Sequence, residues 1–95
     1  MAVVFVISGA LRQFSCHRSE IRLDDAEGPL ESALGALWSE VPAVRDRVLT
    51  ERGTVRPHIN IFVNGEDIRY TGGLATVVLD GAEVFLVPAV SGGAR

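Results

Sequence analysis

The first third of the chain carries two patterns of apolar residues that predict strands. Residues 3–7 form an unbroken, β-branched apolar run, typical of a strand inside a sheet that is covered on both faces. Residues 11–14 can continue this strand after a turn or a bulge. In residues 18–23 polar and apolar side chains alternate, so Ile21 and Leu23 would face the core. We expect the two segments to form a hairpin.

An apolar stripe after Pro29 predicts one main helix. Pro29 stands where a helix tolerates proline best, at its first position. The stripe recurs at helical spacing and consists of Leu30, Leu34, Leu37, Trp38 and Val41. Pro42 ends this helix, and a shorter one is expected over residues 42–49.

An alternating strand followed by a turn is the clearest pattern in the chain. Residues 59–63 alternate, with the odd-numbered apolar side chains on one face. The pair Asn64-Gly65 follows and favours a tight hairpin turn, because both residues tolerate positive φ. We expect residues 68–70 to form a short return strand.

The last strand is expected at residues 83–88, after an Asp80-Gly81 turn. One main helix covers one face of a sheet, so we expect a mixed sheet of four to five strands packed on that helix and the short one. The first strand would lie at the centre, beside the last. The sequence therefore predicts an α+β, β-grasp (ubiquitin-like) domain over residues 1–90, followed by a flexible tail, residues 91–95.

Composition and charge exclude several classes of protein. The chain has 95 residues, 47% of them hydrophobic and 22% charged, which is typical of one globular domain. A net charge of −3 excludes a general nucleic-acid binder. The apolar start is too short for a membrane span and lacks the basic leader of a secretion signal, and the single cysteine, Cys16, fits a reducing cytoplasm. All nine basic residues are arginine, so no lysine is present to receive an isopeptide bond.

The second half of the chain resembles the sulfur-carrier proteins of the ThiS/MoaD group. The likeness rests on a Val-Asn-Gly hairpin at 63–65, an Asp-Gly turn at 80–81 and a Pro-Ala-Val-x-Gly-Gly end at 88–93, in that order. It is dense over residues 59–93 and loose before them. Within the group, the chain is most similar to the carriers that serve cysteine synthesis in actinobacteria.

The resemblance implies that Gly93 is the working end of the protein. In this family the terminal glycine carboxylate is adenylated by an E1-like enzyme that consumes ATP, and is then converted to a thiocarboxylate that donates sulfur to an acceptor synthase. Gly92 and Gly93 map onto the two terminal glycines, and the lack of a Cβ suits a tail that must enter a narrow channel. The protein would be a cosubstrate rather than an enzyme, with no bound cofactor or metal of its own.

Ala94-Arg95 departs from the simplest members of the family. While this dipeptide remains, the Gly93 carbonyl belongs to a peptide bond and offers no carboxylate for adenylation. Similar extensions in some relatives are removed by a JAMM-type zinc metalloprotease, which implies cleavage between Gly93 and Ala94. The alternative is that the dipeptide is foreign to the natural chain. A ubiquitin-like protein modifier and the small subunit of a molybdopterin synthase stay open as other functions.

Two aromatic residues and the tail are candidates for contacts with these partners. Phe62 and Phe85 fall out of phase with the core-facing residues of their strands, so both would lie on the outer face of the sheet. There they would form a docking patch, or be covered by a loop or the short helix. Arg69 would add a polar contact or simply be solvated. The remaining candidates are Pro88, Val90 and Ser91.

Two patterns that suggest catalysis or metal binding have simpler explanations. Cys16 and His17 are neighbours that would point to opposite faces of a strand, without a third group to orient them as a nucleophile and base. His58 has no partner at metal-ligand spacing, so no metal site is expected. Gly72-Gly73 lacks the lysine of a P-loop and is expected to be a turn.

Overall fold

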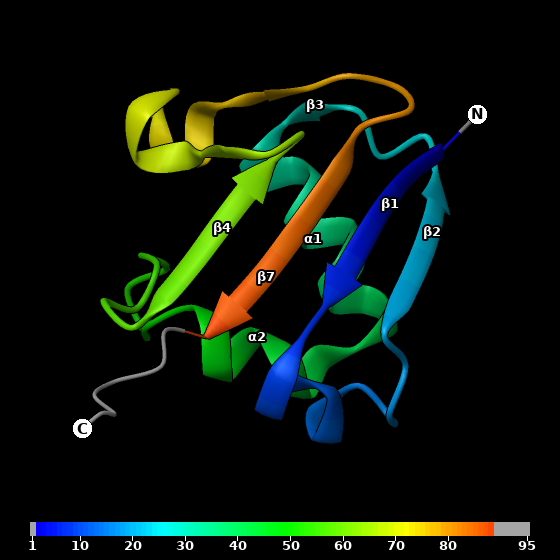
Figure 1. Cartoon of the computed structure of the whole chain (residues 1–95), viewed down its shortest axis with the longest axis vertical. Coiled ribbons are helices and arrows are strands. Elements are labelled where there is room, and N and C mark those ends of the chain that lie inside the picture. The colour runs from blue at the N-terminus through cyan, green and yellow to red at the C-terminus, as the bar shows by residue number, and fades with distance from the viewer. Residues whose placement is uncertain (1, 89–95) are drawn as a thin grey trace.

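A mixed sheet of five strands forms one layer of the protein. A computed structural model of the chain describes residues 2–88. The strands, in chain order, are β1 (Ala2–Ile7), β2 (Glu20–Asp24), β4 (Ile59–Val63), β5 (Glu66–Asp67) and β7 (Glu83–Pro88). Their order in the sheet is β2-β1-β7-β4-β5, with β1 and β7 parallel and the other neighbours antiparallel (Figure 1). The predicted pairing of the first strand with the last is confirmed, although β7 rather than β1 is the central strand.

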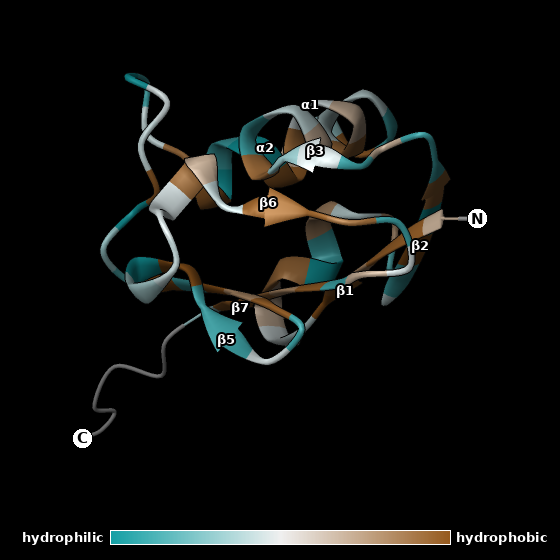
Figure 2. Ribbon diagram, turned by 90° about the horizontal axis from the view of Figure 1, so that it is seen from above, coloured by the Kyte–Doolittle hydropathy of each residue, from teal (hydrophilic) through white to brown (hydrophobic). Residues whose placement is uncertain are grey.

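Two helices form the second layer and cover one face of the sheet. They are α1 (Leu30–Glu40) and α2 (Pro42–Val48), and both lie on the same side of the sheet (Figures 1 and 2). Pro29 immediately precedes α1 as its cap residue instead of occupying its first position. A second sheet of two short strands, β3 (Gly28–Pro29) and β6 (Val77–Val78), lies beside the start of α1. The α+β, β-grasp architecture is confirmed.

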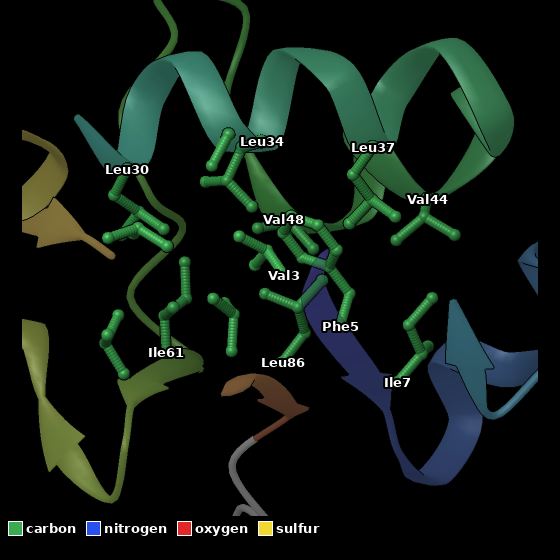
Figure 3. Packing of buried hydrophobic residues seen from close by; sticks show 14 of the residues in the cluster. Val3, Phe5, Ile7, Leu30, Leu34, Leu37, Val44, Val48, Ile61 and Leu86 are labelled. Carbon is green, nitrogen blue, oxygen red and sulfur yellow. The ribbon is translucent and has the colours of Figure 1, made fainter. Parts of the chain in front are cut away.

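The core lies between the two layers. Val3, Phe5 and Ile7 of β1 point from the sheet toward Leu34 and Leu37 of α1 (Figure 3). All five side chains are buried, at 1% exposure or less. Trp38, in the predicted stripe, is half-buried against this core. On the other face of β1, Val4 and Val6 are only half-buried, so the expectation of a strand covered on both faces is wrong.

Two short segments expected as strands are 3-10 helices. Residues 11–14 belong to η1 (Gly9–Phe14), which turns away from β1 instead of continuing it. The return strand of the hairpin is Glu66–Asp67, directly after the turn, and residues 68–70 form η2 (Ile68–Tyr70). A third 3-10 helix, η3 (Gly73–Ala75), follows. In η2 the Asp67 carboxylate accepts a hydrogen bond from the Arg69 backbone N–H at 2.9 Å, which favours the turn over an extended strand.

Candidate functional site

The end of β7 is the part of the structure from which the predicted tail departs. β7 lies between β1 and β4, so its backbone is paired on both sides. Its final residue, Pro88, lies opposite Ile59, the first residue of β4. Five of the predicted site residues lie outside the described residues: Val90, Ser91, Gly92, Gly93 and Ala94. Of this region, the structure therefore describes the end of β7, to which these residues are attached.

The loop after β1 packs against the end of β7. The backbone N–H and the hydroxyl of Ser8 both donate to the carbonyl of Leu86, each at 3.2 Å. The next residue, Gly9, has φ +63°, and a Cβ placed there would lie 3.3 Å from Cγ of Pro88. Glycine is thus needed at position 9 for its backbone conformation and for the close approach of Pro88. In the sequence, the only signal for Ser8 and Gly9 is that they break the first apolar run.

Phe62 and Phe85 lie opposite each other on neighbouring strands. Together they belong to a row of five residues that crosses the whole sheet, made of Glu20, Val6, Phe85, Phe62 and Asp67. The helices lie on the other face, so the short helix does not cover this row (Figure 1). Phe62 and Phe85 are each half-buried. The outer face of the sheet therefore carries an aromatic centre with an acidic residue at each end.

Arg69 lies beside one end of this row. Its Nη2 donates to Oδ1 of Asn60 on β4, and its Nε lies 3.6 Å from Oδ1 of Asp67. The expectation that Arg69 is simply solvated is therefore wrong, because its side chain contacts two other side chains. It joins Asn60 of β4 to Asp67, the last residue of β5.

Cys16 and His17 are exposed and lie in the turn between η1 and β2. Both have positive φ, at 57° and 62°, so the argument that placed them on opposite faces of a strand does not apply. His58 is exposed as well, just before β4. Within residues 2–88, no three histidine, cysteine or acidic side chains come together as a metal site would require. Gly72, with φ of 113°, lies in the predicted turn, and Gly73, with φ of 62°, begins η3.

The sequence model of the ThiS family matches residues 6–93. The chain belongs to the ThiS family. It is 43% identical over 70 residues to a putative sulfur carrier protein of Archaeoglobus fulgidus, covering 73% of this chain and 80% of that one. It is 35% identical over 72 residues to small archaeal modifier protein 3 of Haloferax volcanii, covering 76% of each. The relatives of this ThiS-family chain thus include proteins named as carriers and proteins named as modifiers.

The fold of this ThiS-family chain is similar to that of a solved relative in a complex. The crystal structure of the BexX/CysO complex of Amycolatopsis orientalis contains a chain that superposes with a TM-score of 0.85 at 28% identity. The superposition covers 97% of this chain and all of that one. In the described part of the chain, no helix is both long and apolar enough to cross a membrane.

Proposed function

We propose that this protein is a sulfur carrier whose Gly93 carries the sulfur as a thiocarboxylate. The observation that supports the proposal most directly is that the family match extends beyond the end of the central strand at Pro88 and through Gly92 and Gly93. Carrier names among the relatives support the same function. A cytoplasmic location belongs to this proposal, since the thiocarboxylate chemistry uses ATP and a reduced sulfur source.

The chemistry takes place on the Gly93 carboxylate. That carboxylate attacks the α-phosphate of ATP on an E1-like enzyme, pyrophosphate leaves, and an acyl-adenylate forms. A sulfur nucleophile supplied by the partner then attacks the Gly93 carbonyl carbon and displaces AMP. An unactivated carboxylate resists such attack, so the adenylate is what makes the transfer possible. The protein itself holds no cofactor in this scheme and acts as a cosubstrate of its partners, ending with delivery of sulfur to an acceptor synthase.

Exposure of the Gly93 carboxylate requires removal of Ala94-Arg95. A peptide bond to Ala94 leaves Gly93 without a free carboxylate. We assign this cleavage to a JAMM-type zinc metalloprotease, in line with the family resemblance. The full chain would then be a precursor that the activating enzyme does not use.

The outer face of the sheet is the surface proposed to dock the activating enzyme. Phe62 and Phe85 form an aromatic pair there, and the helices leave it uncovered. Aromatic residues at the centre of an interface, surrounded by polar ones, commonly supply most of the binding free energy. Pro88, which ends β7 beside Gly9, would fix the direction in which Val90 and Ser91 lead the tail away from this surface.

A protein modifier is the second candidate, because Haloferax relatives are named as modifiers. A modifier would use the same activated Gly93, but its product would be an amide bond to an amine of another protein. This chain has no lysine, so it would be the donor in such a reaction and not an isopeptide acceptor. A molybdopterin synthase subunit would instead be found in a stable complex with its large subunit.

The test compares the full chain with a chain ending at Gly93. Each is incubated with the E1-like enzyme of its own organism, ATP and sulfide, and the intact mass is measured. We expect the truncated chain alone to gain the mass that corresponds to replacement of one oxygen by sulfur. Adding the metalloprotease to the full chain should restore the same product.

Two outcomes would contradict the proposal. Thiocarboxylate on the full chain but not on the truncated one would show that Gly93 is not the working end. Conjugates to target lysines without any thiocarboxylate would favour the modifier.

A further inference from the structure

β4 is paired along its whole length on only one of its two edges. β7 pairs with all of Ile59–Val63, whereas β5 pairs only with Phe62 and Val63. The Asn64 N–H donates to the Glu83 carbonyl at 2.8 Å, toward β7. Because backbone groups alternate between the two edges of a strand, the N–H and C=O of Ile61 point away from β7. Within residues 2–88, no strand pairs with this edge at Ile59 and Ile61, and Figure 1 shows it open between the residues before β4 and η2.

An apolar cavity of about 590 Å³ lies along this open edge. Its apolar lining consists of Val55, Ile59, Ile61, Ile68 and Leu74. The three isoleucines are buried, while Val55 and Leu74 are half-buried at the mouth. Since side chains of paired strands alternate together, every second residue of a strand added to β4 would face the cavity.

Two arginines lie at the rim of the cavity. Arg56 is held by a hydrogen bond from its Nε to the Asp46 backbone carbonyl at 3.0 Å, and no described carboxylate forms an ion pair with it. Arg69, on the other side, has Asp67 as its ion-pair partner. The rim therefore keeps a net positive charge on a chain whose formal net charge is −3. An acidic group on the ligand is the charge that complements it.

The cavity lies near the departure point of the tail. Ile59, which lines it, pairs with Pro88. Gly93 follows Pro88 by five positions, so the extended chain between them spans at most roughly 18 Å. A partner held on this edge would therefore be within reach of Gly93. This last point rests on the proposed function of Gly93, whereas binding at the edge does not.

We propose that the open edge of β4 binds an extended segment of a partner protein. The segment pairs with the N–H and C=O of Ile61 and inserts apolar side chains, two residues apart, into the cavity. An acidic residue next to this apolar core contacts Arg56 and Arg69. This surface lies at the edge of the sheet, whereas the aromatic row lies on its outer face, and Arg69 borders both.

The test begins with a library of random 12-residue peptides displayed on phage and selected against the full chain. We expect the enriched peptides to share apolar residues at alternate positions and an aspartate or glutamate beside them. A synthetic copy of the strongest peptide should shift the backbone amide resonances of Ile59, Ile61 and Ile68. It should leave those of Val4 and Phe85 unchanged.

Matched variants separate edge pairing from other modes of binding. The double variant R56E/R69E should weaken binding of this peptide about tenfold, while R22E on β2 should leave it unchanged. Replacing a central residue of the peptide by proline removes a backbone donor and should abolish binding. The reaction of Gly93 with its activating enzyme is not part of this test, so failure of one proposal leaves the other standing.

Each of four results would overturn the inference. They are selection of no peptide, a consensus without acidic residues, resonance shifts confined to the outer face, and undiminished binding of the proline peptide. The last of these would indicate a cavity that accepts ligands without strand pairing. A fifth is self-association of the full chain through this edge in sedimentation experiments, which would make a second copy its occupant.

Discussion

The contact between Gly9 and Pro88 controls how the end of β7 is held. Gly9 has a positive φ and lies so close to Pro88 that even a methyl group would press on the proline ring. Ser8, the residue before Gly9, donates a hydrogen bond to the carbonyl of Leu86 in β7. Two successive residues, Ser8 and Gly9, thus contact the end of the strand that leads to the tail, at Leu86 and at Pro88.

Substitution of Gly9 by alanine tests this contact. We expect G9A to lower the free energy of unfolding by about 2 kcal/mol, from the strained backbone and the pressure on Pro88 together. G81A is the matched control, because Gly81 has φ +88° but nothing within 4 Å of an added Cβ. It should lose only the backbone part, about 1 kcal/mol. Urea unfolding of both variants measures the difference, and equal losses would show that the Pro88 contact contributes nothing.

At the scale of elements, the sheet brings one residue from each of its five strands into one row. Phe62 and Phe85 lie at its centre, with Val6 on the adjoining strand and Asp67 and Glu20 at the ends. A partner that covers the row would bury the aromatic pair and meet a carboxylate on either side. Basic residues flanking an apolar surface are the complement expected on such a partner.

Replacing both phenylalanines by serine tests the outer face. Since Phe62 and Phe85 are only half-buried, F62S/F85S should lower the free energy of unfolding by roughly 1 to 2 kcal/mol. Its affinity for the activating enzyme should fall at least about tenfold, as for residues central to an interface. Y70S is the control, because Tyr70 is 86% exposed and lies in η2. Calorimetric titration of the chain ending at Gly93 measures the affinity, and an unchanged value for the double variant would remove the outer face from the proposal.

The longer elements could be predicted from the sequence and the shorter ones could not. The alternation of Ile59, Ile61 and Val63 reflects one buried face, and the Asn64-Gly65 turn depends on local backbone preferences, with φ of 51° and 86°. The turn of η1 depends instead on Ser15, whose buried hydroxyl contacts the carbonyls of Arg12 and Arg18. Such contacts depend on the particular loop, and the pattern of polar and apolar residues does not predict them.

Of the two candidate sites, one could be predicted from the sequence and the other could not. The aromatic pair could be predicted because each phenylalanine alternates with the core-facing residues of its strand and so points to the other face. The cavity beside β4 could not, since its walls come from several short segments, the residues before β4 together with η2 and η3, and only the fold shows how these segments are arranged around β4. The short β5 leaves the edge open, and its length became evident only from the pairing.

At the scale of the whole molecule, the buried apolar residues form one continuous cluster. Residues from both helices and from strands β1, β2, β4, β6 and β7 contribute to it. A cluster shared by both layers couples their stability, so neither layer keeps its packing when the other is lost.

This continuity predicts a single cooperative unfolding transition. Trp38, the one tryptophan of the chain, packs against the cluster from α1 and reports on it through fluorescence. Far-ultraviolet circular dichroism reports on the helices and strands together. We expect the two signals to give the same midpoint in urea. Loss of the fluorescence signal at a lower urea concentration would contradict the coupling and indicate a layer that separates first.

The position of β7 also has a mechanical consequence. The strand is paired with β1 on one side and β4 on the other, and its final residue is the attachment point of the tail. A pull on the tail acts along the strand, so it loads both hydrogen-bond ladders in shear at the same time instead of opening them one bond after another. A protein built this way can have its end drawn into a narrow channel by a partner while the domain behind it withstands the force.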